Sequence, residues 1–170
     1  MNRYAKFLII GLLPPSLCLG LESDSEQQIS IQADSALFSE LDGATQYLGD
    51  VELVQGSISV TSDQLMVYSN EGEIERIVAT GNPATYRQLP EVGDEMVVAR
   101  SMTIDYKVSE DMLYLVDEAS LVQGETALRG NTIVYDVKAN TLRASGSPGT
   151  ESERVQVIIP PSNSGTEGAE

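Results

Sequence analysis

The segment Met102–Val108 reads MTIDYKV and places an apolar side chain at every second position. Successive side chains of a β-strand point to opposite faces, so this alternation gives one apolar face and one polar face. The same pattern occurs at residues 29–34, 50–53 and 132–138. It is typical of half-buried antiparallel strands, and no helical period appears between these runs.

Turn-forming residues separate the alternating runs at short intervals, and each candidate turn contains Gly, Asn or Asp. The predicted turns lie at Asp42-Gly43, Gly49-Asp50, Gln55-Gly56, Asn70-Glu71-Gly72, Gly81-Asn82-Pro83, Val92-Gly93-Asp94, Gln123-Gly124, Gly130-Asn131 and Ala139-Asn140. Pro83 and Pro90 both fall where we expect a connection between strands. Many short strands with closely spaced turns predict an all-β domain, which could be a sandwich, a jelly roll or an open barrel.

The sequence also repeats itself at an offset of 68 residues. Val51–Gly56 reads VELVQG and matches ASLVQG at Ala119–Gly124, and the similarity continues into the following run. Upstream, Ala33-Asp34-Ser35 matches Ala99-Arg100-Ser101, which implies that two residues were gained between the two matches. A repeat of this length predicts two similar, hairpin-rich halves stacked along one axis of a curled double layer.

The residue types exclude several chemistries. The 170 residues include no His and no Trp, and the only Cys is Cys18. A Ser-His-Asp or Cys-His nucleophile, a His-ligated zinc site and a disulfide framework are therefore all excluded. The carboxylate pairs Glu110-Asp111 and Asp117-Glu118 lie at predicted turns, where they are solvated and poorly suited to acid-base catalysis. An enzyme is the least favoured class, and no segment has the spacing of a calcium-binding loop.

The N-terminal residues have the order of a secretory signal peptide. Two basic residues precede an apolar run at Phe7–Leu13, and the segment PPSLCLG, which includes the small residues Ser16, Cys18 and Gly20, follows it. The run is too short to span a bilayer, so we expect residues 1–20 to be removed on export, with cleavage after Gly20 or Cys18. An uncleaved anchor and a lipid anchor on Cys18 are alternatives, and the bulky Leu17 disfavours the second.

The charge balance is strongly acidic. The chain has 10 basic and 26 acidic residues and a net charge of −16, and without residues 1–20 it keeps 8 basic residues and a net charge of −18. Nucleic acid is excluded as a partner, because affinity for it comes mainly from Lys and Arg contacts with phosphates. The acidity is typical of a solvated outer surface.

Composition divides the exported chain into three parts. Residues 21–28 form a polar lead-in, and residues 29–144 are rich in β-branched and aromatic side chains. Residues 145–170 turn to Ser, Gly, Pro and Glu, so we expect this tail to be mostly disordered. One apolar run at 155–159 could form a last strand.

Five segments together resemble the OstA-like domain of the LptA family of periplasmic lipopolysaccharide-transport proteins. They are ISIQAD at 29–34, GDVELVQG at 49–56, SDQL at 62–65, GNPATY at 81–86 and GNTIVY at 130–135. The resemblance covers residues 29–144 and implies a twisted, slightly open β-jelly roll whose apolar interior carries the acyl chains of lipopolysaccharide. It also implies head-to-tail self-association in a Gram-negative periplasm, forming a bridge from an inner-membrane LptC-type component to an outer-membrane LptD-type component.

Candidate lipid contacts follow from the resemblance and from strand parity. The resemblance points to Ile29, Ile31, Tyr86, Tyr106 and Val108 as groove-lining residues. Parity and the repeat add Val51, Leu53, Val60, Ile104, Leu121, Leu128, Ile133 and Tyr135. Inward apolar residues are ordinarily core, so a self-assembling structural protein with a dry core is the main alternative. An inner-membrane-anchored relative is another, and it requires that the N-terminal segment be retained.

Overall fold

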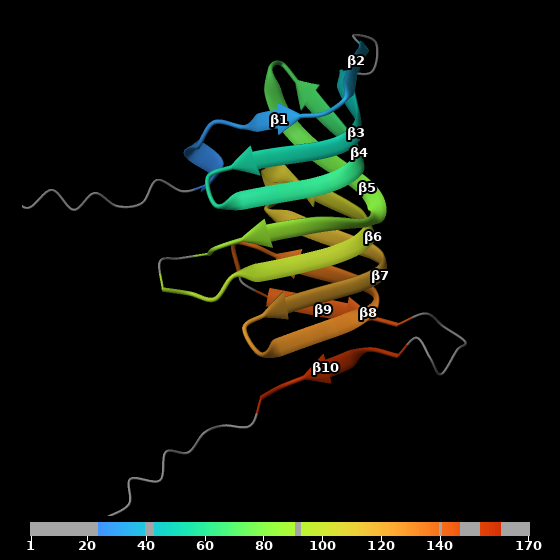
Figure 1. The fold of residues 1–170 in the computed structure, drawn as a ribbon. Coiled ribbons are helices and arrows are strands. Elements are labelled where there is room, and N and C mark those ends of the chain that lie inside the picture. The colour runs from blue at the N-terminus through green and yellow to red at the C-terminus, as the bar shows by residue number, and fades with distance from the viewer. Residues whose placement is uncertain (1–23, 40–42, 91–92, 140, 147–153, 161–170) are drawn as a thin grey trace, which may run out of the picture.

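The computed structural model describes residues 24–39, 43–90, 93–139, 141–146 and 154–160, and these form one antiparallel sheet (Figure 1). Its strands are β1 (Ser30–Gln32), β2 (Ser35–Ser39), β3 (Ala44–Gln55), β4 (Ile58–Asn70), β5 (Glu73–Gln88), β6 (Val97–Lys107), β7 (Met112–Gln123), β8 (Thr126–Asp136), β9 (Thr141–Ser145) and β10 (Gln156–Ile158). Two 3-10 turns, η1 (Asp24–Glu26) and η2 (Val108–Glu110), accompany them. The predicted all-β, open jelly-roll fold class is confirmed.

The strands follow one another across the sheet as a meander. The order is β1-β3-β4-β5-β6-β7-β8-β10, with β2 also paired to β3 and β9 also paired to β8. The predicted turns at Gln55-Gly56, Asn70-Glu71-Gly72 and Gln123-Gly124 join neighbouring strands and are confirmed. The predicted signal peptide at residues 1–20, and most of the predicted disordered tail, lie outside the described residues.

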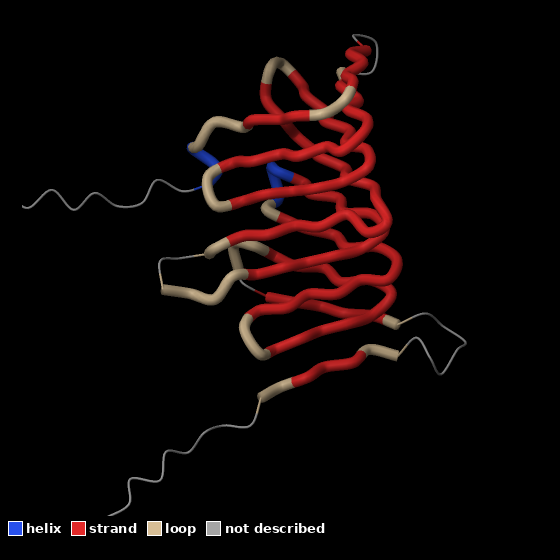
Figure 2. Tube along the Cα trace, viewed as in Figure 1, coloured by secondary structure: helices blue, strands red, loops and turns tan. Residues whose placement is uncertain are grey.

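The central strands bend in the middle and so pass through both layers of the roll. The pairings along β3 to β8 shift register at Leu48/Val51, Thr61/Gln64, Thr80/Ala84, Arg100/Thr103 and Val116/Ala119. These β-bulges kink and twist the strands, and Figure 2 shows the sheet folding over along one side. The result is two facing layers made from one sheet.

Three predicted turns are wrong because they fall at these bends. Gly49-Asp50 lies inside β3, Gly81-Asn82-Pro83 inside β5 and Gly130-Asn131 inside β8. Asp117-Glu118 lies inside β7 in the same way. A residue that accepts a positive φ suits a bulge as well as a turn, as Gly49 does at φ 80°. The central strands are therefore longer than expected, at 11 to 16 residues.

The two halves repeat with one register. Leu53 pairs with Val60 and Leu121 pairs with Leu128, so the offset of 68 residues is preserved in the structure. The prediction that two residues were gained upstream is wrong. Ile31 pairs with Leu53 in the first half and Ala99 pairs with Leu121 in the second half, so the offset there is also 68 residues. A shift of two residues keeps every side chain on the same face, so the alternation alone cannot distinguish the two alignments.

Each end of the sheet carries a strand broken into two pieces. β1 and β2 both pair with the same edge of β3. At the equivalent place in the second half, the single strand β6 pairs with β7. β9 and β10 both pair with the same edge of β8. At the equivalent place in the first half, the single strand β5 pairs with β4. The two edges lie at opposite ends of the stack, as Figure 1 shows.

Candidate functional site

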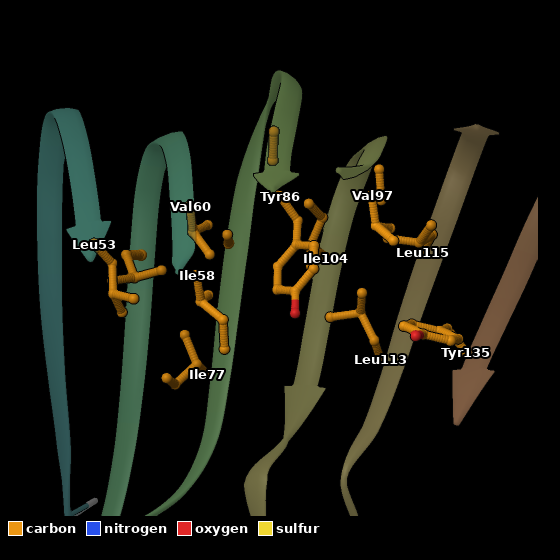
Figure 3. Packing of buried hydrophobic residues seen from close by; sticks show 14 of the residues in the cluster. Leu53, Ile58, Val60, Ile77, Tyr86, Val97, Ile104, Leu113, Leu115 and Tyr135 are labelled. Carbon is orange, nitrogen blue, oxygen red and sulfur yellow. The ribbon is translucent and has the colours of Figure 1, made fainter. Parts of the chain in front are cut away.

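Side chains from both layers meet in one apolar core (Figure 3). Eight of the predicted residues are buried in it: Val51, Leu53, Val60, Tyr86, Ile104, Leu121, Ile133 and Tyr135. The other five are partly buried and pack against it: Ile29, Ile31, Tyr106, Val108 and Leu128. Strand parity therefore predicted the inward face, whereas the role of these residues as lipid contacts stays a prediction.

A small pocket lies within the core, lined mostly by aliphatic side chains. Five predicted residues line it: Leu53, Val60, Tyr86, Ile104 and Tyr106. Sequence reasoning missed the other five: Gln55, Ile58, Ile77, Ala79 and Leu113. Of these, Ile58 and Leu113 could have been found by extending the alternation along β4 and β7. Ile77 could not, because the bulge in β5 changes which positions face inward between Tyr86 and Ile77.

The pocket is nearly closed. It holds about 20 Å³ of free space, which is room for about one water molecule. The two layers are therefore in contact in this state. Any larger guest requires them to separate.

Two tyrosine hydroxyls mark polar points on the pocket wall. The Tyr86 hydroxyl donates a hydrogen bond to Gln88 Oε1 at 2.8 Å, and the Tyr106 hydroxyl donates to Asp111 Oδ1 at 3.3 Å. Burial is the main reason that the pKa of Tyr86 is raised, and burial followed by the nearby Asp111 raises the pKa of Tyr106 to about 12. Both hydroxyls are consequently neutral donors at physiological pH.

A polar network that sequence reasoning missed lies beside this wall. Gln88 is buried at the end of β5, and its Nε2 donates to Asp24 Oδ2 at 3.1 Å. Gln55 in the pocket wall donates from Nε2 to the Gln27 carbonyl oxygen at 3.1 Å. The polar lead-in thus contacts one end of the apolar interior.

The interior continues to both ends of the sheet, where apolar side chains are left exposed. At the N-terminal end, Phe38 pairs with Thr45 on the inward face of the sheet and is 63% exposed. At the other end, Leu142 and Val157 pair with the inward residues Tyr135 and Leu128, and Val157 is 55% exposed. Phe38 and Leu142 were not predicted as site residues.

The described part of the chain offers no group of three or more His, Cys, Asp or Glu residues that could hold a metal ion. Nor does it contain a helix long and apolar enough to cross a membrane. The features on which the site rests are therefore the apolar interior, its polar edge and its two open ends.

Fold and interior together define an open β-jelly-roll protein with an apolar interior between its two layers. Residues 30–141 match the family described as LptA/(LptD N-terminal domain) LPS transport protein. The chain belongs to this family, and the resemblance drawn from the five sequence segments is confirmed.

Relatives are similar over nearly the whole chain. The lipopolysaccharide export system protein LptH of Pseudomonas aeruginosa is 36% identical over 162 residues, which cover 91% of this chain and 93% of the relative. The export system protein LptA of Escherichia coli is 28% identical over 166 residues, which cover 95% of this chain and 88% of the relative. The crystal structure of LptH, described as a periplasmic component of the lipopolysaccharide transport device, matches with a TM-score of 0.76 and 31% identity. That match covers 82% of this chain and the whole of the solved LptH chain.

Proposed function

We propose that this protein carries lipopolysaccharide across the periplasm by covering its acyl chains between the two layers of the jelly roll. The observation that carries the proposal is the apolar interior, which extends from the exposed Phe38 at one end to the exposed Leu142 and Val157 at the other. The names of the relatives, which are lipopolysaccharide export proteins, support the same cargo.

The energetics favour an enclosed route. An acyl chain of about a dozen methylenes exposed to water costs roughly 10 kcal/mol, at about 0.8 kcal/mol for each group. A carrier in an aqueous compartment must cover each chain along its whole path. An interior lined by inward side chains from two layers provides this cover without any catalytic group.

Loading requires the roll to open. The pocket has room for about one water molecule, whereas one acyl chain has about a dozen methylenes, each about as large as a water molecule. The layers are continuous on the bent side, where the strands cross from one layer to the other. Opening therefore takes place on the opposite side, where the hairpin turns lie.

The broken edge strands are the proposed docking surfaces. A short edge strand with unpaired backbone groups accepts another strand, and β1 with β2 at one end complements β9 with β10 at the other. Head-to-tail copies would join one interior to the next, with an LptC-type component at the inner membrane and an LptD-type component at the outer membrane. The functional domain is residues 29–144, and residues 1–20 direct export to the periplasm as a cleaved signal peptide.

A structural protein without lipid cargo is the second candidate. The small free volume of the core pocket favours it, since a fully packed core has the same appearance. The two candidates differ in whether the layers separate to admit a lipid.

A photo-crosslinking pair distinguishes the candidates. Tyr106 points inward and lines the pocket, whereas Tyr114 lies between the buried Leu113 and Leu115 on β7 and points outward. A photoreactive phenylalanine analogue at position 106 should capture lipopolysaccharide in growing cells, and the same analogue at position 114 should not. Equal capture at both positions, or capture at neither, would count against an interior lipid route.

A further inference from the structure

Hydrogen-bond donors converge on the carboxylate of Asp24 at the polar edge of the interior. The Ser57 backbone N–H donates to Oδ1 at 2.7 Å, and Gln88 Nε2 donates to Oδ2 at 3.1 Å. The Ser57 hydroxyl lies 2.7 Å from Oδ2 and 3.0 Å from the Leu89 carbonyl oxygen. Its single hydrogen goes to the charged, nearer acceptor. The chain thus forms a three-donor oxyanion site that its own carboxylate occupies.

This site is continuous with the apolar pocket. Gln88 accepts a hydrogen bond from the buried Tyr86 hydroxyl, and the Tyr86 ring lines the pocket. Gln55, which also lines the pocket, holds the Gln27 carbonyl beside Asp24. A lipid whose acyl chain entered the pocket from this edge would bring its polar head to the three donors.

The carboxylate is held by a segment that can leave. η1 has three residues, and no strand pairing anchors the described residues that precede Ser30. Gly56 keeps the turn open for it, because a Cβ at this position, where φ is 58°, would overlap Asp24 Oδ1. Figure 2 shows η1 in blue beside the turn between β3 and β4. Releasing Asp24 exposes the donors without unpairing any strand.

We infer that Ser57 and Gln88 form a subsite for a phosphate group of the lipid cargo, and that Asp24 fills this subsite when no cargo is bound. A phosphate presents the same acceptor oxygens as a carboxylate, and neutral donors converging at a turn bind such anions. The exchange also removes Asp24 from the subsite as the phosphate arrives, so two negative groups never occupy it together. This inference rests on the proposed lipid-carrier function.

The second half of the molecule provides an internal control. There the Glu95 carboxylate lies against Gly124, where a Cβ would overlap it, as Asp24 lies against Gly56. Val60 in the first half pairs with Tyr86. Its equivalent in the second half, Leu128, pairs with Val157 instead of with a tyrosine. The second half therefore lacks the tyrosine and amide that link the turn to the pocket, and Glu95 makes the same turn contact without a subsite.

The test measures binding of two probes by the purified protein, bisphosphorylated lipid A and the same lipid A fully dephosphorylated. Asp24→Ala should tighten binding of the phosphorylated lipid by about tenfold and leave the dephosphorylated lipid nearly unchanged, because it frees donors that only the phosphate uses. Adding Gln88→Leu or, as a milder change, Ser57→Ala should remove that gain. Glu95→Ala should change neither affinity.

Other outcomes overturn the inference or its basis separately. If Asp24→Ala changes both affinities by the same factor, or changes neither, Asp24 is not a stand-in for phosphate. If the wild-type protein binds neither lipid, the proposed function fails instead.

A fluorophore on Glu26→Cys distinguishes the lipid head from free phosphate as the source of the anion. Glu26 is exposed on η1 and makes none of the contacts described above. Release of η1 should follow addition of phosphorylated lipid A but not of inorganic phosphate at the same concentration. Release by inorganic phosphate at that concentration would assign the site to the free ion and overturn the lipid assignment.

Discussion

Arg76 and Asp105 form a two-pronged ion pair that joins the two halves of the molecule. Arg76 Nε and Nη2 each lie 2.8 Å from a carboxylate oxygen of Asp105, across the pairing of β5 with β6. The guanidinium also lies 5.4 Å from the centre of the Tyr68 ring on β4. The hydrogen bonds to Asp105 raise the pKa of Arg76, which keeps it charged throughout the accessible pH range.

Replacing Asp105 should destabilise the protein only modestly. The pair is on the outer face with the arginine side chain 47% exposed, so Asp105→Asn should lower the free energy of unfolding by about 1 kcal/mol or less. Urea unfolding measures this difference. Glu110→Gln, which removes the looser 3.5 Å contact with Lys107, should have no measurable effect. A loss of several kcal/mol in Asp105→Asn would mean that the join between the halves depends on this pair.

Two buried leucines on β7 should separate stability from lipid binding. Leu113 and Leu115 are both fully buried, and only Leu113 lines the pocket. Each change to Ala should cost about 2 to 5 kcal/mol of unfolding free energy by leaving a cavity. Leu113→Ala also enlarges the pocket, so it should bind lipid A more tightly than Leu115→Ala at equal stability. Equal affinities in the two variants would place the acyl chain elsewhere.

Stability should fall at high pH, partly because of Tyr106. Its pKa is raised from 10.0 to about 12 in the folded protein, so the folded state keeps a proton that the unfolded state loses. The stability linked to this proton is complete below pH 10 and is lost as the pH rises from 10 towards 12. Urea midpoints at pH 8, 10 and 11 should fall more steeply for the wild type than for Tyr106→Phe. Parallel falls would assign the effect to other groups, such as the buried Tyr86.

Alternation along the strands made most of the interior predictable. Positions such as Ile104 and Tyr135 needed only parity, because a residue and its second neighbour share a face wherever no bulge lies between them. Strand ends were less predictable at the bends. Gly49-Asp50 has the residues of a turn, and only the pairing of Leu48 with Gln64 and Val51 with Ser62 reveals a bulge instead.

The polar edge of the site was not predictable from local pattern. Asp24 and Gln88 are 64 residues apart, and nothing in the composition of the lead-in sets Asp24 apart from its acidic neighbours. Phe38 was missed for a different reason. Among the described strands, its short strand β2 pairs with β3 alone, so the side chain faces inward yet remains exposed, and burial patterns do not mark such a residue.

Self-association should depend on the C-terminal edge. Val157 and Ile159 are exposed beside the inward face of β8, while β1 and β2 leave an unpaired edge at the other end. Head-to-tail contact between these edges does not close on itself, so the oligomer should grow with protein concentration. Deleting Thr141–Glu170 removes β9 and β10 and should abolish this growth. Lipid binding should remain, because no residue that lines the pocket is deleted.

Salt should strengthen the same contact. Residues 21–170 have a net charge of −18, so copies repel one another at low ionic strength. The screening length falls below about 10 Å above roughly 0.1 M salt, which weakens this repulsion while leaving strand pairing and apolar contact intact. Sedimentation velocity of the full and truncated proteins measures the effects of salt and of the deletion. The two salt concentrations, about 0.02 M and about 0.3 M, lie well below and well above roughly 0.1 M. A truncated protein that still polymerises in high salt would move the docking surface away from β9 and β10.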